Sequence, residues 1–455
     1  MDVLLVGING RYSHTNLALR YLRNEIRAEG HRARIFELTI SDRRQDILEK
    51  IAIDEPQVVL LSVYVWNATL VAALIPDLRS LLPKAALILG GPEVSYSAEE
   101  WLRKHPEIDC IICGGGEAAV RRLAQQGFVT GAERVLRIPN PPFTQIPFPY
   151  LDEDVRGFDF RYIYYESSRG CPCACAYCVS GRADQQPEFR PLDLTLRELD
   201  RIIAMEQHLA GPPIVKLVDR TFNADPERAR GIWRHLAEAE TQARFHFEVH
   251  PAFLSGADLE VLAGVPPERF QFEIGVQSVH ARTLRDIRRA GSWQSARPMV
   301  ERLITLGTVA VHLDLIVGLP HDGPEELAAS VEDLLALKPH RFEIGFLKSL
   351  PGTAIRATAG RNDQVAMHEP PYQVLSNRWL SLGDIARFRR IEQLVDAVWN
   401  ANHLEAELDG FACICGGYFA ALEALSTHAE RTGYNLTTRK RHKVEAFLRE
   451  CAAHM

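Results

Sequence analysis

The sequence lacks the long apolar segment that a membrane helix requires. No uninterrupted apolar run reaches the roughly 18 residues needed to cross a bilayer. The amino terminus has a short apolar stretch at residues 3–8 and an acid, Asp2, close to its start. A secretory signal peptide needs a basic start and a longer apolar core, so we expect a cytoplasmic protein with no membrane partner.

The chain also has no excess of positive charge. The formal net charge of its 455 residues is −7, which argues against general polyanion binding and leaves only local basic patches, such as residues 439–443, for a nucleic acid. The composition is 46% hydrophobic and 24% charged, which is an ordinary globular mixture. At about 100–200 residues per domain, the length predicts two to four domains.

Cysteine is scarce except at one place. Of nine cysteines, four crowd into residues 171–178, Cys413 and Cys415 form a close pair, and three are isolated. In a reducing cytosol such a cluster is typical of a metal site and not of a disulfide framework. For Cys413 and Cys415 we weigh a redox or hydrogen-donating pair against two small structural residues, and favour the structural interpretation.

Residues 1–127 alternate short apolar runs with helical patterns. Continuous apolar strands separated by helices indicate a parallel sheet covered on both faces, so we predict a doubly wound, flavodoxin-like α/β domain. Ligands of such sheets bind beyond the carboxyl ends of the strands. Five prolines between residues 139 and 149 predict an irregular linker over 128–160. The five expected strands are residues 3–8, 32–38, 58–65, 85–91 and 109–116.

The alternation resumes in residues 161–360 and then fades. Six strand-like runs, each followed by a helical pattern, predict a partial (β/α)6 TIM-like barrel, whose catalytic residues lie at the carboxyl ends of its strands. Residues 361–455 lose the strand signal and predict a helical C-terminal domain. We expect this last domain to cap the barrel mouth and shape the substrate pocket.

The first barrel strand leads directly into a cysteine motif. Cys171, Cys175 and Cys178 have the spacing C-x3-C-x2-C, and Tyr177 precedes the last cysteine. Three thiolates on one loop can hold three irons of a [4Fe–4S] cluster and leave the fourth iron open to a small molecule. Structural zinc needs four ligands, commonly as two pairs, and an electron-transfer cluster would need Cys173 as a fourth ligand. We interpret Cys173 as structural and the other three cysteines as the metal ligands and catalytic residues.

This motif after a first barrel strand resembles that of the radical S-adenosylmethionine superfamily. The resemblance implies that the open iron binds the amino and carboxylate groups of S-adenosylmethionine. It also implies that an electron from the cluster cleaves this cosubstrate to a 5′-deoxyadenosyl radical. Polar and glycine residues at the barrel rim would contact the cosubstrate. Those candidates are Tyr177, Asp219, Arg220, Glu273, Gln277 and Gly318.

The amino-terminal domain resembles the cobalamin-binding domain fused to one radical S-adenosylmethionine subfamily. Its glycine-rich turns would let the backbone approach a large ligand closely. The sequence departs from many cobalamin proteins because it has no Asp-x-His-x-x-Gly motif, which supplies a histidine ligand to cobalt. We interpret His14 as a loop histidine that can still hydrogen-bond a corrin side chain. The cobalamin-binding candidates are Asn9, Ser13, His14, Ser62, Tyr64, Trp66, Gly91, Pro92, Glu93, Gly115 and Glu117.

The resemblance implies an enzyme that uses a [4Fe–4S] cluster, S-adenosylmethionine and cobalamin. Our first hypothesis is methylation of an unactivated carbon of a small-molecule or peptide substrate, with an electron donor such as flavodoxin or ferredoxin. The second is a cobalamin-assisted rearrangement, ring closure or oxidation without methyl transfer. The third is a non-catalytic cobalamin or cluster sensor. Gain of a methyl group by the product separates the first two, and cleavage of S-adenosylmethionine excludes the third.

Overall fold

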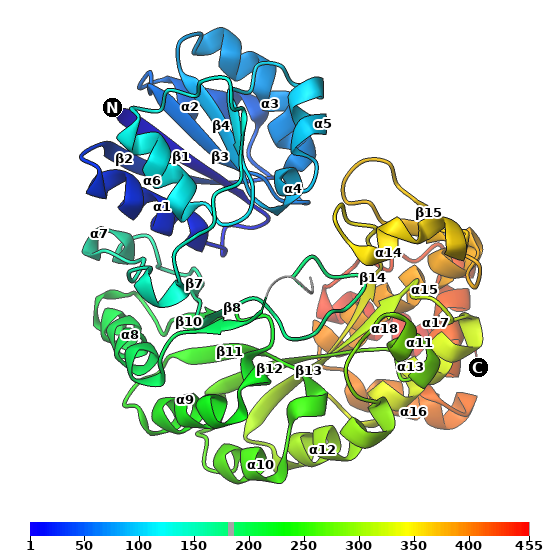
Figure 1. Ribbon diagram of the computed structural model, residues 1–455. Helices are drawn as coiled ribbons and strands as arrows, with labels where there is room; N and C mark the ends of the chain where they lie inside the picture. Colours follow the sequence, from blue (N-terminus) through cyan, green and yellow to red (C-terminus); the bar gives the residue numbers. More distant parts are fainter. Residues whose placement is uncertain (181–185, 455) are drawn as a thin grey trace.

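The computed structural model describes residues 1–180 and 186–454, and it begins with a parallel sheet of six strands (Figure 1). The strand order is β2-β1-β3-β4-β5-β6. Its first five positions follow the flavodoxin-like order 2-1-3-4-5, which confirms the doubly wound fold. The strands are β1 (Asp2–Asn9), β2 (Arg32–Thr39), β3 (Val58–Ser62), β4 (Ala86–Gly90), β5 (Cys110–Ile112) and β6 (Val135–Leu136).

Helices cover both faces of this sheet because successive strand residues point to opposite sides. In β1, Val3 and Leu5 pack into one core with α1 and α6, whereas Leu4 and Val6 pack into another with α2, α3 and α5. A short helix, α4, follows β4 at the carboxyl edge. The helices are α1 (Leu17–Ala28), α2 (Arg44–Ala52), α3 (Ala68–Leu81), α4 (Pro92–Ser95), α5 (Ala98–Lys104) and α6 (Glu117–Gln125).

The segment 128–160 has more regular structure than the irregular linker we predicted. It supplies β6, which pairs with β5, and the short helices η1 (Phe143–Gln145) and α7 (Asp152–Val155). The prolines that suggested a linker lie between β6 and α7 and do not interrupt either. The buried Arg23 guanidinium, 2.7 Å from Asp154, ties the segment back to α1.

The second part is a parallel sheet of six strands that remains open (Figure 1). Its order is β14-β13-β12-β11-β10-β7, so each of the six predicted strands forms and the partial barrel is confirmed. The strands are β7 (Ile163–Tyr165), β10 (Ile214–Leu217), β11 (Arg244–Val249), β12 (Phe270–Gln277), β13 (Val309–Val317) and β14 (Arg341–Phe346). A two-stranded ribbon, β8 (Ser168–Arg169) with β9 (Glu188–Phe189), precedes and follows the cysteine loop.

An outer layer of helices covers this sheet. Apolar residues at alternate positions face the helices: Phe272 stacks on Trp233 of α9, and Phe247 meets the same ring edge to face. The polar residues between them face the lumen of the barrel. The helices are α8 (Leu192–Ala204), α9 (Pro226–Glu238), α10 (Gly256–Leu262), α11 (Ala281–Asp286), α12 (Trp293–Leu306) and α13 (Pro324–Ala336).

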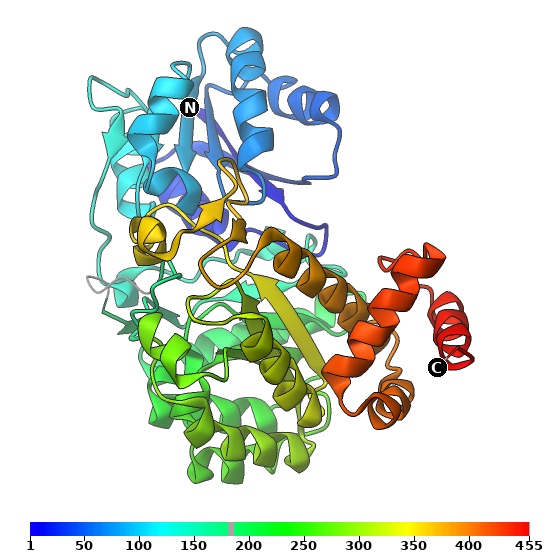
Figure 2. The same ribbon diagram turned by 90° about the vertical axis from the view of Figure 1, so that its right-hand side faces the viewer.

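The carboxyl-terminal helices extend the barrel sideways (Figure 2). Asn400 bonds to both backbone groups of Phe342 in β14, and Trp399 Nε1 donates to Pro339 O at 2.9 Å. The helices therefore share the barrel core and do not sit over its mouth. A preceding segment does reach the rim, where Asn377 Nδ2 donates to Gly318 O. The elements are α14 (Ala354–Ala357), β15 (Val365–Ala366), β16 (Val374–Ser376), α15 (Leu382–Val395), η6 (Asp396–Asn400), α16 (Glu405–Cys415), α17 (Tyr418–Thr432) and α18 (Arg441–Ala452).

One bent pair of the described helices has the length and composition to span a bilayer. Among the described residues, no single helix is long and apolar enough to cross a bilayer, and only α16 with α17 passes that test as a pair bent by 97°. The bend falls at Gly416 and Gly417, which both have positive φ. Leu422 and Leu425 of α17 are fully buried in the core that the tail shares with the barrel.

Candidate active site at the carboxyl edges of two sheets

The cysteine loop starts at the carboxyl end of β7 and is anchored by a buried carboxylate. The Ser167 and Ser168 hydroxyls donate to Asp219 Oδ1 at 2.6 and 2.5 Å, and the Ser167 N–H donates to its second oxygen at 3.0 Å. Burial raises the pKa of Asp219, and these hydrogen bonds oppose that effect. Asp219 thus fixes the loop onto the end of β10, and its direct contact with S-adenosylmethionine stays a prediction.

The three motif thiols lie in different environments. Cys171 Sγ accepts from the Cys173 N–H at 3.4 Å and lies 3.3 Å from Thr221 Oγ1. A hydrogen bond from the Cys173 thiol lowers the pKa of Cys171 to about 6, which favours the thiolate that an iron needs. Cys175 is buried and receives Arg289 Nη1 at 3.8 Å. Cys178 is half-buried and its N–H closes a turn onto Cys175 O.

The donor set fits a cluster better than a single ion. The described residues contain no group of three or more His, Cys, Asp or Glu side chains placed to hold one metal ion. In a [4Fe–4S] cubane each thiolate binds its own iron, so the three ligands need not converge on one point. Cys173 turns toward Cys171 as its hydrogen-bond donor, and its structural role stays a prediction.

Arg289 is a central residue of the site that the sequence patterns did not single out. Its guanidinium donates to Cys175 Sγ, to Tyr177 OH at 3.3 Å and to the carbonyl of Gly275. Arg289 lies 114 positions after Cys175, and only its place after β12 and α11 hints at the contact. One side chain therefore joins the cysteine loop to β12 and holds the ring of Tyr177, which we predicted to contact the cosubstrate.

The rim of β12 and β13 carries buried acceptors without partners. β12 has a register shift between Gly275 and Gln277, and Gln277 has a φ of 71°. This bend brings Gln277 toward the mouth, as its place in the sequence suggested. Gln277 Oε1 and Asp314 Oδ1 are buried and have no hydrogen-bond partner among the described residues. Burial also raises the pKa of Asp314 well above its ordinary value. Such a pair fits a ligand with hydroxyl or amino donors.

The other rim candidates take separate positions. Glu273 lies deeper in the lumen, 3.1 Å from His246 Nε2, and this hydrogen bond lowers its pKa. Arg220 is exposed at the end of β10. Gly318 follows β13 with a φ of 105°, and a Cβ there would lie 3.2 Å from Leu347. The structure brings Gln277 and Gly318 to the rim but places Glu273 below it.

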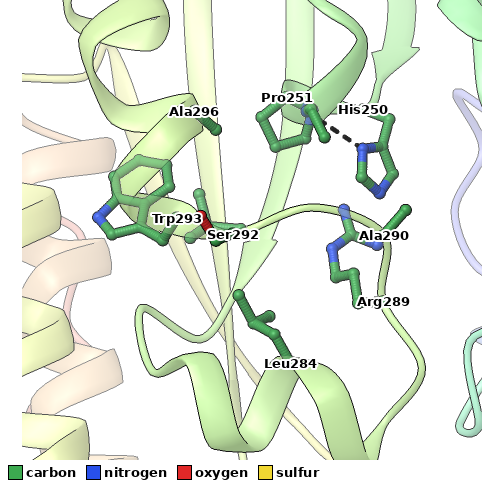
Figure 3. Close-up of a pocket in the computed structure, with 10 residues that line it drawn as sticks. His250, Pro251, Leu284, Arg289, Ala290, Ser292, Trp293 and Ala296 are labelled. Atoms are coloured by element: carbon green, nitrogen blue, oxygen red, sulfur yellow. Dashed lines mark hydrogen bonds between the residues drawn. The ribbon is translucent and has the colours of Figure 1, made fainter.

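A small cavity lies behind Arg289 (Figure 3). Its volume of about 10 Å³ is room for roughly one water molecule. His250 lines it, and the His250 Nδ1 atom accepts from the Ala252 N–H at 3.3 Å. That hydrogen bond assigns the proton to Nε2, which is buried and has no partner among the described residues. His250 therefore offers a free donor next to Arg289, a second feature that the motifs did not reveal.

In the first domain, the loop after β1 faces the barrel. His14 Nδ1 lies 2.5 Å from Tyr164 OH, and the two rings stack with an interplanar angle of 16°. Ser13 O accepts from the Tyr162 N–H at 2.7 Å, and Asn9 Nδ2 donates to His14 O at 3.0 Å. Burial lowers the pKa of His14. These three candidates thus form the junction of the two domains, and their contact with cobalamin stays a prediction.

Two aromatic side chains stack on each other at the end of β3. Tyr64 and Trp66 stack with centroids 4.4 Å apart, and Trp66 Nε1 donates to Ile8 O at 3.2 Å. Trp66 is nevertheless 48% exposed, which is unusual for so large an apolar side chain. Ser62 is buried and donates to Val6 O. An exposed flat ring at the carboxyl edge fits the planar face of a corrin, whereas Ser62 supports the sheet.

The turn after β4 requires glycine. Gly91 has a φ of 112°, and a Cβ there would lie 2.5 Å from Val63 O. Pro92 then begins α4. Glu93 is buried, and Tyr372 OH of the carboxyl-terminal part donates to its carboxylate. Burial raises the pKa of Glu93. The turn therefore meets the carboxyl-terminal segment as well as the sheet edge.

The turn after β5 is bound to the cysteine loop. Arg169, two residues before Cys171, donates to Glu117 Oε1 at 2.6 Å. Asn140 Nδ2 donates to the other oxygen of Glu117 at 2.5 Å. A Cβ at Gly115 would overlap the Asn140 amide. Glu117 and Gly115, predicted to contact cobalamin, thus also lock the first domain onto the loop that carries the motif.

Three families match successive parts of the chain. Residues 3–124 match the B12 binding domain, residues 165–334 match the radical SAM superfamily, and residues 363–449 match a protein of unknown function (DUF4080). The matched ranges follow the first sheet, the partial barrel and the carboxyl-terminal helices.

Three relatives of described function match 65–79% of the chain. The 2-(S-pantetheinyl)-carbapenam-3-carboxylate methyltransferase of Streptantibioticus cattleyicolor is 27% identical over 68% of this chain and 50% of its own. The cobalamin-dependent radical SAM methyltransferase TokK of Streptomyces tokunonensis is 25% identical over 65% of this chain and 48% of its own. The anaerobic magnesium-protoporphyrin IX monomethyl ester cyclase of Synechocystis is 25% identical over 79% of this chain and 70% of its own. The chain thus spans about half the length of the two methyltransferases.

Solved structures share the fold. The cobalamin-dependent S-adenosylmethionine radical enzyme OxsB, with aqua-cobalamin bound, has a TM-score of 0.72 at 15% identity and covers 100% of this chain and 80% of its own. The methyltransferase TsrM from Kitasatospora setae, with cobalamin and a [4Fe–4S] cluster bound, has a TM-score of 0.66 at 16% identity with 100% of both chains covered.

The fold and the site define an α/β protein in which a doubly wound domain faces a partial barrel with a three-cysteine loop. The chain combines a segment that matches the B12 binding domain with one that matches the radical SAM superfamily, and it is homologous to cobalamin-dependent radical SAM methyltransferases.

Proposed function

We propose that this chain is a radical S-adenosylmethionine enzyme that methylates an unactivated carbon of a small-molecule or peptide substrate. Cys171, Cys175 and Cys178 would hold a [4Fe–4S] cluster, and the carboxyl edge of residues 1–127 would hold cobalamin. The observation that carries the proposal is the placement of the three-cysteine loop. It leaves the end of β7 and is bound through Arg169 and Glu117 to the carboxyl edge of the B12 binding domain. A cluster there would face the cobalamin domain across the junction.

When bound, these groups supply a hydrogen-abstracting radical from the cluster and S-adenosylmethionine, and a methyl group from cobalamin. The side chains of this protein fix the geometry. Asp219 holds the start of the loop, and Arg289 holds Cys175 against β12. Gln277 and Asp314 offer buried acceptors for the hydroxyl or amino groups of the cosubstrate. The stacked Tyr64 and Trp66 offer a flat apolar surface to the corrin.

The test is anaerobic reconstitution with iron, sulfide and cobalamin, followed by S-adenosylmethionine, a reductant and candidate substrates. We expect 5′-deoxyadenosine and a product heavier by one CH2 unit. S-adenosylmethionine labelled in its methyl group should transfer that label to the product. A product of unchanged carbon count, formed with 5′-deoxyadenosine, would contradict methyl transfer while leaving the radical chemistry intact.

A second candidate function is radical rearrangement, ring closure or oxidation without methyl transfer. It is favoured by the likeness to the magnesium-protoporphyrin ester cyclase, which covers 79% of this chain. The same labelling experiment separates the two functions, because rearrangement, ring closure and oxidation add no carbon to the substrate. A cobalamin or cluster sensor without catalysis would form no 5′-deoxyadenosine under reduction.

A further inference from the structure

The lumen of the barrel is lined by polar side chains, unlike the packed interior of a closed barrel. Closed (β/α)8 barrels fill their interior with layers of Val, Ile and Leu. Here the outward positions are apolar and buried, while the inward positions of neighbouring strands carry ionisable or amide side chains. These inward residues are Lys216 of β10, His246 and Glu248 of β11, Gln271 and Glu273 of β12, His312 and Asp314 of β13, and Arg341 and Glu343 of β14.

This lumen is an open chamber. Glu273 lies in the middle of β12, a strand with neighbours on both sides, yet its side chain is 43% exposed. The side chains of Arg341 and Glu343 on the edge strand β14 are 39% and 47% exposed. A cavity of about 170 Å³ opens at the amino-terminal ends of β10 to β13, where His246 and Gln271 line it. This cavity opens at the end of the strands opposite to the cysteine loop and reaches the lumen at His246 and Gln271.

Several polar groups in this lumen pair with one another, whereas the Lys216 ammonium forms no ion pair within the part of the chain that the structure describes. Arg341 binds Glu343, and Gln271 Nε2 lies 3.0 Å from His312 Nδ1. Lys216 has no ion pair or hydrogen bond among the described residues, and its ammonium lies 4.8 Å from the centre of the Tyr162 ring. Burial lowers the pKa of Lys216, so its charged form is incompletely solvated. An unpaired cation in such a place fits an anionic group of a ligand.

A negative pole lies two strands away from Lys216 on the same sheet. Glu248 and Glu273 are partners in the register of β11 and β12. Burial raises the pKa of Glu248 to about 7, whereas the hydrogen bond with His246 lowers the pKa of Glu273, so Glu273 is the charged member. Glu273 engages only one ring nitrogen of His246. The other, His246 Nδ1, is unpartnered in a side chain that is 5% exposed and lines the cavity. The chamber thus offers both charges together with a buried hydrogen-bonding group.

The spacing of the two poles suits a small molecule. Lys216 pairs in register with His246, which itself pairs with Gln271, two residues before Glu273. Strands about 4.8 Å apart with a rise of about 3.3 Å per residue place the two Cα atoms on the order of 12 Å apart. Extended Lys and Glu side chains then shorten the gap between the charges, because the curved sheet points them toward a common interior.

We propose that the chamber below the cysteine loop is the substrate site and that it selects a free amino acid or a close zwitterionic analogue. In this assignment Lys216 binds the carboxylate, and Glu273 accepts from the ammonium group. The inference rests on the proposed function, since it names the substrate class of the same active site. It also disfavours apolar polycyclic substrates, which would strip water from several charges without pairing them.

The test is thermal unfolding of the cluster-loaded protein, under anaerobic conditions, with each proteinogenic amino acid in turn. We expect at least one amino acid to raise the Tm by several degrees, because a ligand that binds only the folded state stabilises it. Its N-acetyl derivative and its methyl ester each keep one charge, and each should give less than half of that rise. No shift with any amino acid, or an equal shift with either derivative, would overturn the inference.

Matched variants assign the two poles. Lys216→Met should abolish the preference for the free acid over the methyl ester, while Lys216→Arg keeps it. Glu273→Gln should abolish the preference for the free amine over the N-acetyl derivative. Unchanged preferences in folded Lys216→Met and Glu273→Gln proteins would overturn the assignment. Iron content and 5′-deoxyadenosine formation are measured in the same wild-type preparation. If both are absent, the proposed function fails; if both are present and no amino acid binds, only the substrate class fails.

Discussion

At the scale of single residues, the site depends on groups that are distant in sequence. The motif cysteines are local, but the side chains that position them are not: Asp219 and Arg289 come from the ends of β10 and from the segment after α11. The side chains of Asp219 and Arg289 lie away from bulk water, and each forms several hydrogen bonds. These hydrogen bonds make the loop rigid. The roles of these residues can therefore be separated from those of the ligands by substitution.

Arg289→Met tests the contact with Cys175. Removing a cationic donor near a cluster thiolate makes reduction harder, because the reduced cluster carries more negative charge. We expect the midpoint potential to fall on the order of 60 mV, which for one electron corresponds to about 1.4 kcal/mol. A redox titration followed by electron paramagnetic resonance measures it. Arg288→Met, at the exposed neighbouring position, is the control and should leave the potential unchanged. An equal shift in both variants would argue against a specific contact.

Asp322→Asn tests a buried carboxyl group beside β12. Burial raises the pKa of Asp322 from 3.8 to about 6, although the Thr283 and Ser278 hydroxyls bond to it. The folded state therefore binds the proton more tightly than the unfolded state. Protonation of Asp322 therefore stabilises the folded state. This stabilisation is fully present below pH 3.8 and is lost as the pH rises through about 6. We expect the variant to exceed the wild type in free energy of unfolding by roughly 2–3 kcal/mol at neutral pH.

The difference in free energy of unfolding should decrease as the pH falls toward the pKa of the Asp322 carboxyl group in the unfolded chain. Urea unfolding at several pH values measures it, with the exposed Glu260→Gln on α10 as a control that shows little change. A gain in stability that is independent of pH would contradict the assignment to the titration of Asp322.

At the scale of elements, sequence patterns predicted the strands well and their junctions less well. Strands of the first sheet are buried on two faces and leave continuous apolar runs, whereas strands of the second sheet alternate buried apolar residues with polar ones that face the lumen. The short β6 was missed, since Val135 and Leu136 alone are too few residues to form a pattern. The bulge at Gln277 lies next to Gly275. The partners of Glu117 and Glu93 are Arg169 and Tyr372, which lie far along the chain.

Gly91→Ala tests the turn between β4 and α4. An alanine there would adopt a φ of 112° and place its Cβ 2.5 Å from Val63 O. We expect the first domain to lose about 1–3 kcal/mol of stability, and cobalamin retention to fall with it. Gly10→Ala is the matched control at the same edge, because no atom lies within 4 Å of a Cβ at that position. Urea unfolding and the visible absorbance of retained cobalamin report both effects. Equal behaviour of the two variants would contradict the strain argument.

At the scale of the whole molecule, two carboxyl edges meet around the cysteine loop. The junction is held by Glu117 with Arg169, by His14 with Tyr164, and by Glu93 with Tyr372 of the carboxyl-terminal part. The order of domains and the cysteine spacing were predictable from the sequence, because both are local properties. The lining of the chamber was not, because a polar residue within an apolar strand does not reveal whether it faces solvent or a lumen.

The most direct test of the account compares Cys175→Ala with Cys173→Ala after anaerobic reconstitution. Both substitutions remove one thiol from the same loop, and only Cys175 is assigned as an iron ligand. We expect Cys175→Ala to lose the bound [4Fe–4S] cluster and to form no 5′-deoxyadenosine, while Cys173→Ala keeps both. Iron content and cleavage of S-adenosylmethionine that survive in Cys175→Ala would contradict the central claim.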